Sequence, residues 1–478
     1  MRGPQYSTQL QKRLWKMKYY SEQIGEYIAQ LEYEDLPGPV VEQAKWVILD
    51  AIGVAIASWD TAWSLAVYNM IRKKAGSPES TIFYFGDKVP DMNAALVNAM
   101  FIQSMDLNDD LSGIHTGAIL PPTAMAVGEP LLSTGREIIT SIVIGYDVAS
   151  RLAEAINSQA LFEQGYQPSA ILGGFAAVAS ACKLHKLTTP QIVNAFGISG
   201  SYTGGTIEFL KDGTDTKRFN IAKSTQAGII STHLAREGLT GPGGIFEGDH
   251  GIFQLMSENT DPTKLVADLG TRFDILETSF KKYPFCDGAF CPLDAALAIV
   301  RENDLDIEDI AALRFRIKSF LVPFLADYHG DTTRKYRPQN FTDAQFSLPY
   351  IIALGILKDG DIQAGDFSPE NYNDPAILRL AQKVSACGDK ELDKVPFRPM
   401  AMPSIATIEM KDGRTFVQRA DYHRGDPRNP FTETEYLEKF QANVGGQLNK
   451  SAADRLVELI TGLEKLSSIS DIMKYAVR

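Results

Sequence analysis

The stretch Ile171–Ala181 carries no charged side chain, and most of its residues are Gly, Ala or Ser. It lies inside a longer segment, Ala170–Leu184, whose composition favours a helix. A helix that is apolar on every side cannot face water on any side and must be surrounded by other elements. This one segment therefore predicts a core of several helical layers, because a single-layer bundle would leave one of its faces exposed.

Other segments in the first half of the chain repeat apolar residues at helical spacing. The clearest opens after Pro39 and places Ala44, Val47, Ile48 and Ala51 on a wide stripe. The helices expected on this basis are Glu42–Ala57, Met92–Met105, Ile138–Ile156 and Ala222–Glu237. Residues 1–276 are therefore predicted to form most of a large all-helical domain.

The pattern changes after Leu276. Leu313–Lys318 alternates apolar and basic residues, as a half-buried strand does. Alternation at Ala406, Ile408 and Met410, followed by a turn with Gly413 and a second extended run, predicts a hairpin. We expect a smaller α+β domain over 277–425. A return to the helical domain is expected over 426–478, where Thr432 and Glu435 have the spacing of a capping box. The predicted fold class is mainly α.

Charge and composition narrow the function. Lys and Arg total 47 and Asp and Glu total 59, so the formal charge is 47 − 59 = −12. This balance argues against nucleic-acid binding, and it requires a local basic pocket for any anionic substrate. Four cysteines without CxxC spacing exclude a disulfide scaffold and disfavour a structural zinc site. Apolar runs such as Trp46–Ser58 are too short for a membrane span, and the basic, polar segment Met1–Ser21 does not have the features of a secretory signal. A soluble cytoplasmic protein is expected.

Several stretches, read in order, match one protein family. They are Ala44–Gly53, Val97–Asp109, Ser133–Arg136, Gly145–Val148, Gly238–Pro242, Phe246–Gly251, Lys281–Cys286 and Asp343–Tyr350. On these motifs the chain resembles the MmgE/PrpD family, which includes 2-methylcitrate dehydratase, cis-aconitate decarboxylase and iminodisuccinate epimerase. The resemblance implies a helical domain built from both chain ends, an α+β lid, a homodimer, and no organic cofactor or metal. It also implies a small polycarboxylate substrate in the cleft between the domains.

The segment Met105–His115 contains three aspartates. Asp106, Asp109 and Asp110 have i, i+3, i+4 spacing, so they share one face if the preceding helix continues that far. Three such carboxylates would raise a pKa or demand a cationic neighbour. The alternative is a helix that ends in a polar loop. The resemblance places the family's functional aspartate and histidine at Asp106 and His115, and Asp110 stands where decarboxylase-like members carry threonine.

Thr216–Lys223 supplies three basic side chains just before an expected small-residue helix. A helix N-terminus favours an anion and Lys217 would reinforce it, although a solvated charge run is the alternative. The resemblance matches Lys217 to a lysine of the substrate pocket and Lys281 to a lysine of the lid. Two lysines that converge from separate domains would explain how a protein of charge −12 binds an acid.

Three positions depart from the family pattern. Gln167, Asn220 and Cys291 stand where the family commonly has histidines. The two amides are able to donate hydrogen bonds to a carboxylate but not to shuttle a proton. Cys291 is either a titrating group whose pKa is lowered by a nearby lysine or a small buried apolar residue. Tyr166 is a candidate acid or a packing residue.

Three hypotheses follow for the function. The first is a cofactor-independent lyase that dehydrates or decarboxylates an acid of the methylcitrate/cis-aconitate type, with Lys217 and Lys281 on its carboxylates and His115 and Asp106 at the proton. The second is an isomerase or epimerase, in which Cys291 or Tyr166 supplies a second proton-transfer group. The third is an inactive relative that binds a carboxylate or a partner protein.

Overall fold

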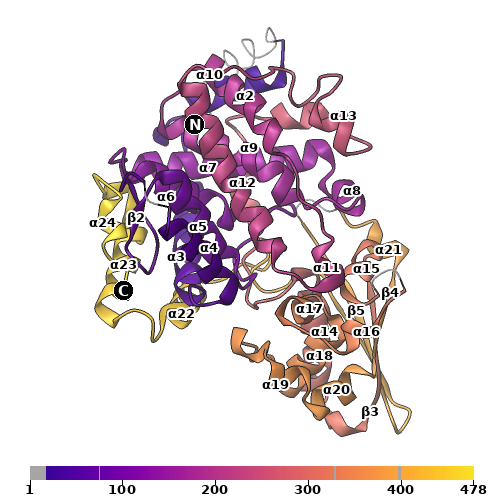
Figure 1. Cartoon of the computed structure of the whole chain (residues 1–478). Coiled ribbons are helices and arrows are strands. Elements are labelled where there is room, and N and C mark those ends of the chain that lie inside the picture. Colours follow the sequence, from indigo (N-terminus) through magenta and orange to yellow (C-terminus); the bar gives the residue numbers. More distant parts are fainter. Residues whose placement is uncertain (1–17, 75, 328–329, 397–399) are drawn as a thin grey trace, which may run out of the picture.

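The computed structural model describes residues 18–74, 76–327, 330–396 and 400–478. The described chain forms a large helical lobe and a smaller α+β lobe (Figure 1). The mainly α fold class that the sequence predicts is confirmed. Most of the basic N-terminal segment, residues 1–17, lies outside the described residues. No helix in the described part of the chain is long and apolar enough to cross a membrane.

The helical lobe is built around α9. This helix is buried along almost its whole length and packs against α6, α7, α10 and α12, as expected for a helix without a polar face. Small residues allow the close approach, since a Cβ on Gly228 of α12 would lie 2.4 Å from Ala177 Cβ. The longer helices of the first half are α2 (Tyr20–Gln30), α3 (Gly38–Ala57), α4 (Ala62–Arg72), α5 (Asp91–Gln103), α6 (Leu120–Gly128), α7 (Gly135–Ile156), α9 (Pro168–Leu184), α10 (Thr189–Ser199) and α12 (Thr216–Arg236).

Shorter elements connect these helices. They are β1 (Ser80–Thr81), β2 (Lys88–Val89), α8 (Ser158–Glu163), α11 (Phe209–Asp212) and α13 (Ile252–Met256). The strands β1 and β2 pair with each other and are separate from the main sheet.

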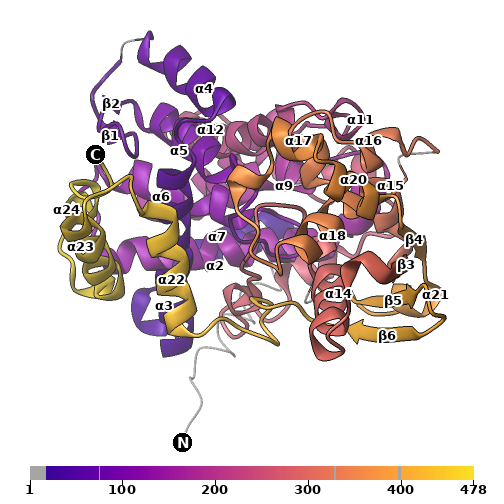
Figure 2. The same ribbon diagram turned by 90° about the horizontal axis from the view of Figure 1, so that it is seen from below.

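The smaller lobe contains a four-stranded sheet of order β4-β3-β5-β6. The predicted hairpin is present as β5 and β6, and β3 pairs antiparallel with β5 and parallel with β4. The helix α14 packs on β5 and β6 and lies beside α18 (Figure 2). The strands are β3 (Ile310–Ile317), β4 (Val384–Gly388), β5 (Ser404–Met410) and β6 (Thr415–Ala420), and the helices are α14 (Phe290–Glu302), α15 (Val322–Leu325), α16 (Thr333–Tyr336), α17 (Phe341–Gln345), α18 (Leu348–Leu357), α19 (Pro369–Tyr372), α20 (Pro375–Ala381) and α21 (Lys390–Asp393).

The end of the chain packs back on the helical lobe through α22 (Glu433–Val444), α23 (Lys450–Thr461) and α24 (Ser470–Met473). The predicted capping box is present at the start of α22, where Thr432 and Glu435 cap each other. Tyr436 stacks on Trp46 of α3 with ring centroids 4.8 Å apart. One apolar core therefore joins both ends of the chain, and a second core fills the smaller lobe. The second core also takes in Ile207, Phe209 and Leu210 from the segment before α12.

Candidate functional site

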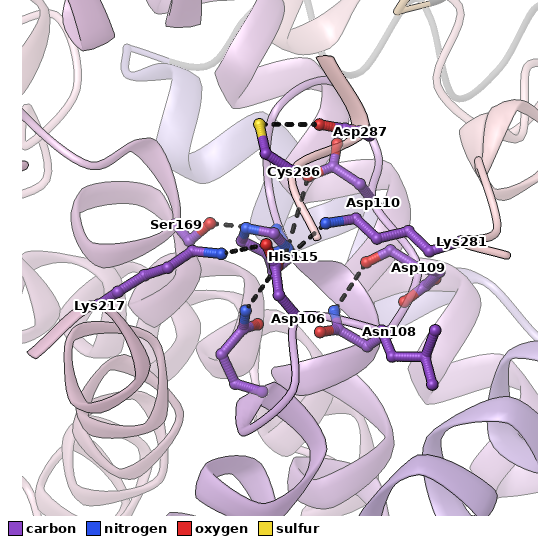
Figure 3. A network of polar contacts seen from close by, with 12 residues as sticks. Asp106, Asn108, Asp109, Asp110, His115, Ser169, Lys217, Lys281, Cys286 and Asp287 are labelled. Atoms are coloured by element: carbon purple, nitrogen blue, oxygen red, sulfur yellow. Dashed lines mark hydrogen bonds and ion pairs between the residues drawn. The ribbon is translucent and has the colours of Figure 1, made fainter. Parts of the chain in front are cut away.

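A cavity of about 100 Å³ lies where the two lobes meet. Its size suits a small molecule. Six of the nine residues that the sequence proposes for a site line it: Asp106, Asp110, His115, Gln167, Lys217 and Lys281. Figure 3 shows how most of them lie around His115.

The aspartate-rich segment is a loop, and the three aspartates do not share a helical face. The helix α5 ends at Gln103, and Asp106 adopts a left-handed backbone with φ = +56°. Aspartate tolerates this conformation better than most residues, at a cost of about 1 kcal/mol. The turn sends Asp106 and Asp110 into the cavity, while Asp109 points away from it. The alternative interpretation, a helix that ends in a polar loop, is therefore correct.

Asp106 is the centre of a buried ion cluster. Its Oδ2 lies 2.6 Å from Lys217 Nζ, and its Oδ1 accepts hydrogen bonds from Lys281 Nζ at 3.0 Å and from Gln103 Nε2 at 3.1 Å. Burial alone would raise the pKa of Asp106, but the attraction of the two lysines outweighs it and holds that pKa well below its ordinary value. Asp106 is therefore a carboxylate at any physiological pH.

Lys217 belongs to α12 and Lys281 to the segment that connects the two lobes, and their pKa values shift in opposite directions. Lys217 lies in the first turn of α12, so the basic segment that was expected to precede this helix forms its first two turns. Burial lowers the pKa of Lys217, despite the attraction of Asp106. Burial also acts to lower the pKa of Lys281, but the carboxylates around it, Asp106 first, raise that pKa above its ordinary value. The Lys281 ammonium is consequently the more firmly charged of the two.

His115 and Asp110 lie beside each other in the cavity, and burial favours the neutral form of both. His115 Nδ1 lies 3.7 Å from Asp110 Oδ2 and 3.8 Å from Asp106 Oδ1. Burial, together with Lys217, lowers the pKa of His115 well below its ordinary value. Burial, together with Asp287, raises the pKa of Asp110 well above its ordinary value. Burial therefore favours a protonated carboxyl group beside a neutral imidazole, two groups with complementary roles in proton transfer.

Asp109 belongs to a different environment on the other side of the loop. Its Oδ2 accepts a hydrogen bond of 2.5 Å from Tyr146 Oη on α7. Burial raises the pKa of Asp109 to about 7, although the Tyr146 hydrogen bond opposes the shift. Nearby, Lys439 of α22 pairs with Asp50 at 2.5 Å and donates to Leu107 O at 2.9 Å. This second cluster anchors the loop to the helical lobe.

Arg218 and Gln345 join the loop to the smaller lobe. The fully buried Arg218 guanidinium donates to Ser104 O at 2.7 Å and to Gln345 Oε1 at 2.9 Å. Gln345 Nε2 in turn donates to Met105 O at 2.8 Å and to Pro284 O at 2.7 Å. The pair therefore fixes the backbone just before Asp106 and just after Lys281.

A short backbone bridge adds a second connection between the aspartate loop and the segment that leads to Lys281. Asp110 N donates to Ser279 O and Ser279 N donates to Asp110 O, both at 2.9 Å. The bridge is antiparallel and lies two residues before Lys281. It therefore holds Asp110 and Lys281 in fixed relation.

The three other proposed site residues lie outside the cavity lining. Asn220 donates from Nδ2 to Thr206 O at 3.2 Å. Tyr166 is half-buried and packs against the helical core. Cys291 is buried in α14, and burial raises the pKa of its thiol. Of the positions that depart from the family pattern, only Gln167 faces the cavity, and its Oε1 is buried without a hydrogen-bond partner among the described residues.

The structure adds residues that sequence reasoning missed. Cys286 and Asp287 line the cavity beside Lys281, and burial raises the pKa of the Cys286 thiol to about 12. Cys286 is the last residue of the Lys281–Cys286 motif and Asp287 follows it, so their position in the sequence could have marked them as site residues. An apolar wall completes the lining, and nothing in its local sequence distinguishes these residues from core: Phe162, Phe209, Leu210, Phe320, Leu321, Phe324, Phe346, Met400 and Met402.

In the described part of the chain, one group of side chains has the composition of a metal site. Asp91, His185 and His233 bring their ligand atoms within 4.8 Å of one another. None of these three residues lines the cavity. The polar side chains that line the cavity carry ammonium, carboxyl, imidazole, amide, thiol and hydroxyl groups.

Comparison with known proteins identifies the family of the chain. The sequence profile of the MmgE/PrpD N-terminal domain matches residues 22–265, and that of the MmgE/PrpD C-terminal domain matches residues 283–465. The chain belongs to the MmgE/PrpD family.

Relatives within the family are similar over nearly their whole length. Cis-aconitate decarboxylase of Aspergillus terreus is 24% identical over 95% of this chain and 94% of the relative. The cis-aconitate decarboxylase-like protein oryM of Aspergillus oryzae is 22% identical over 94% of this chain and 96% of the relative. Cis-aconitate decarboxylase of Mus musculus is 26% identical over 95% of this chain and 92% of the relative. This MmgE/PrpD chain therefore spans both domains of its relatives.

Proposed function

We propose that the cavity is the active site of a lyase that acts on a small polycarboxylic acid of the methylcitrate/cis-aconitate type, and that its reaction is decarboxylation. The observation that carries the proposal is the convergence of Lys217, Lys281, Asp106 and His115 in one buried cavity. The similarity to cis-aconitate decarboxylases supports it. Dehydration is the alternative within the same class.

The two lysines account for binding of the acid. Their ammonium groups are buried, and a carboxylate–ammonium contact in such a site is stronger than one at an open surface. Asp106 holds both lysines in place in the absence of substrate. A substrate carboxylate that approaches Lys281 or Lys217 would share the ammonium with Asp106.

Decarboxylation of an unsaturated acid balances with the groups that line the cavity. In a glutaconate skeleton, −OOC–CH=C–CH2–COO−, the bond between the CH2 carbon and its carboxylate breaks and carbon dioxide leaves. The electron pair of the broken bond forms a new double bond between the CH2 carbon and the central carbon. The electrons of the original double bond move onto the CH carbon and are delocalised into the remaining carboxylate. A fixed ammonium stabilises that charge, and a proton added next to the remaining carboxylate completes the product.

Asp110 and His115 supply that proton. Burial favours the protonated form of Asp110 and the neutral form of His115, so Asp110 is the donor and its carboxylate is then reprotonated from solvent through His115. Dehydration would use the same pair with His115 as the base. The isomerase hypothesis named Cys291 or Tyr166 as the second proton-transfer group, and neither lines the cavity.

The remaining expectations are part of the same proposal. We propose that the reaction proceeds without an organic cofactor or a metal, in a cytoplasmic homodimer. Undiminished activity after dialysis against EDTA would support the first point, and a solution mass twice that of the chain would support the homodimer.

The experiment incubates the protein with cis-aconitate, 2-methylcitrate or citrate in deuterated buffer and follows the carbon skeleton by NMR. Loss of one carboxyl carbon with a single deuterium incorporated is the expected result. Loss of water alone would make the protein a dehydratase, and exchange without net product would favour an isomerase. A protein that binds these acids without any exchange would contradict the proposal and favour the inactive relative.

A further inference from the structure

Part of the cavity wall is apolar and comes from both lobes. Phe162 of α8 lies against Phe324 of α15 with ring centroids 4.3 Å apart. Phe346 lies near Phe209 at 6.3 Å and below Lys217, whose Nζ is 5.0 Å from the ring centroid. Met400, Met402 and Phe320 extend this wall. These side chains give the cavity an extended apolar surface.

The charges that line the cavity do not match a triple anion. Among the described residues, the cations of the lining are Lys217 and Lys281, and Asp106 already contacts both. Two more carboxyl groups, Asp110 and Asp287, also line the cavity. Lys335 lies behind the wall, but its ammonium donates to the carbonyl oxygens of Phe324 and Phe346. A third substrate carboxylate would thus find no further ammonium among the described lining residues, only neutral donors such as the Gln159 and Gln167 amides, the apolar wall or an aspartate.

We infer that the preferred substrate is an unsaturated dicarboxylate that carries a short alkyl group where cis-aconitate carries its third carboxylate. The inference rests on the proposed function. The two carboxylates lie at the lysines and the alkyl group lies against the phenylalanine and methionine side chains. The small volume of the cavity restricts the alkyl group to a few carbons.

The chemistry does not need the third carboxylate. Decarboxylation of a 3-alkylglutaconate breaks the same bond, releases carbon dioxide and places the charge on the same remaining carboxylate. The proton from Asp110 again completes the product, a 3-alkyl-3-butenoate. The alkyl group takes no part in the electron flow and contributes through burial alone.

The test compares kcat/KM for cis-aconitate, glutaconate, 3-methylglutaconate and 3-propylglutaconate, which share one skeleton. Burial of one methylene corresponds to a factor of about four. We expect kcat/KM to rise about fourfold per carbon from glutaconate to the methyl acid and further to the propyl acid, and both alkyl acids to exceed cis-aconitate. A higher kcat/KM for cis-aconitate than for both alkyl acids would overturn the inference and leave the proposed function standing.

Binding of unreactive analogues separates the two proposals. Calorimetry with 3-propylglutarate and tricarballylate, which lack the double bond, measures recognition without turnover. Tighter binding of 3-propylglutarate supports the inference even if no acid of the series is decarboxylated, in which case the proposed function alone fails. Tighter binding of tricarballylate overturns the inference.

Two variants locate the preference in the cavity. Met402→Gln keeps the size of a wall side chain and makes it polar, so the ratio of kcat/KM for 3-propylglutaconate to that for glutaconate should fall at least fivefold. Met256→Gln changes a half-buried methionine outside the lining and is the matched control. Asp287→Asn removes a carboxylate and should raise kcat/KM for cis-aconitate relative to the propyl acid about tenfold. Unchanged ratios in both lining variants would overturn the inference.

Discussion

Asp106 and Asp109 stand three residues apart on one loop, and both are buried, yet they have opposite protonation behaviour. Asp106 faces the cavity, where Lys217 and Lys281 hold its pKa well below the ordinary value. Asp109 faces α7, where its hydrogen bond comes from the neutral Tyr146 and its pKa rises to about 7. Burial acts to raise the pKa of both carboxyl groups. The identity of the hydrogen-bond donor therefore decides which carboxyl group is an anchor for cations and which is close to neutral.

The largest effect is expected from removing one cation of the Asp106 cluster. Lys281→Met should lower kcat/KM for decarboxylation by about 10² to 10³, because the charge of the intermediate loses a fixed counter-ion. Lys282→Met is the matched control, since this neighbour is exposed and its ammonium lies over the Tyr283 ring. Steady-state kinetics on both variants provide the measurement. Equal rates in the two variants would remove Lys281 from the mechanism.

The second prediction concerns the carboxylate itself. Asp106→Asn leaves two buried ammonium groups without their counter-ion and should lower the free energy of unfolding by about 3–5 kcal/mol. Asparagine tolerates the left-handed backbone at this position, so the loss reports charge and not strain. Urea denaturation at pH 7 measures it. A loss below about 1 kcal/mol would show that the cluster does not need its anion.

At neutral and alkaline pH, Asp109→Asn should raise the free energy of unfolding, whereas Asp106→Asn should lower it. The folded pKa of Asp109, about 7, is above its unfolded value, so its contribution to stability is fully present at low pH and is lost as the pH rises through 7. The asparagine variant avoids this loss. It should gain stability over the wild type between pH 4 and pH 8, by at most about 4 kcal/mol. Denaturation curves of both proteins at the two pH values are the check, and a variant whose stability relative to the wild type is lower at pH 8 than at pH 4 would contradict the sign.

The smallest expected effect concerns pH and turnover. Because the pKa of His115 lies below its ordinary value of 6.5, kcat should show no inflection near pH 6.5. The alkaline decline should instead report loss of the Asp110 proton. Asp110→Asn should remove that decline and lower kcat about tenfold or more. The pH–rate profiles of both proteins decide the point: an inflection at 6.5 in the wild type, or an unchanged alkaline limb in the variant, would contradict it.

The sequence alone was sufficient for much of the fold. The uncharged run at Ile171–Ala181 predicted a fully buried helix, and α9 is that helix. Alternation around Gly413 predicted the hairpin β5–β6, and the Thr432–Glu435 spacing predicted the start of α22. Patterns of this kind are local, so a few neighbouring residues carry the whole signal.

The site was less predictable because it depends on contacts between distant segments. The motifs suggested that Lys217 and Lys281 converge, and both line the cavity with Asp106 and His115. The direction of Asp109 depends on one left-handed residue, which spacing does not reveal. The wall from Phe162 to Met402 spans 240 positions, so only the folded chain identifies it as a surface for substrate.

The pairing of Arg218 with Gln345 has a consequence for how molecules reach the cavity. Its hydrogen bonds hold carbonyl groups on both sides of the junction, at Met105 and at Pro284. Swinging the lobes apart as wholes would break the hydrogen bonds of Arg218 and Gln345 across the junction, at a net cost of about 1–3 kcal/mol for each one. Entry of a small molecule into the cavity through side-chain rearrangement near its mouth would leave these hydrogen bonds intact and would not require a hinge.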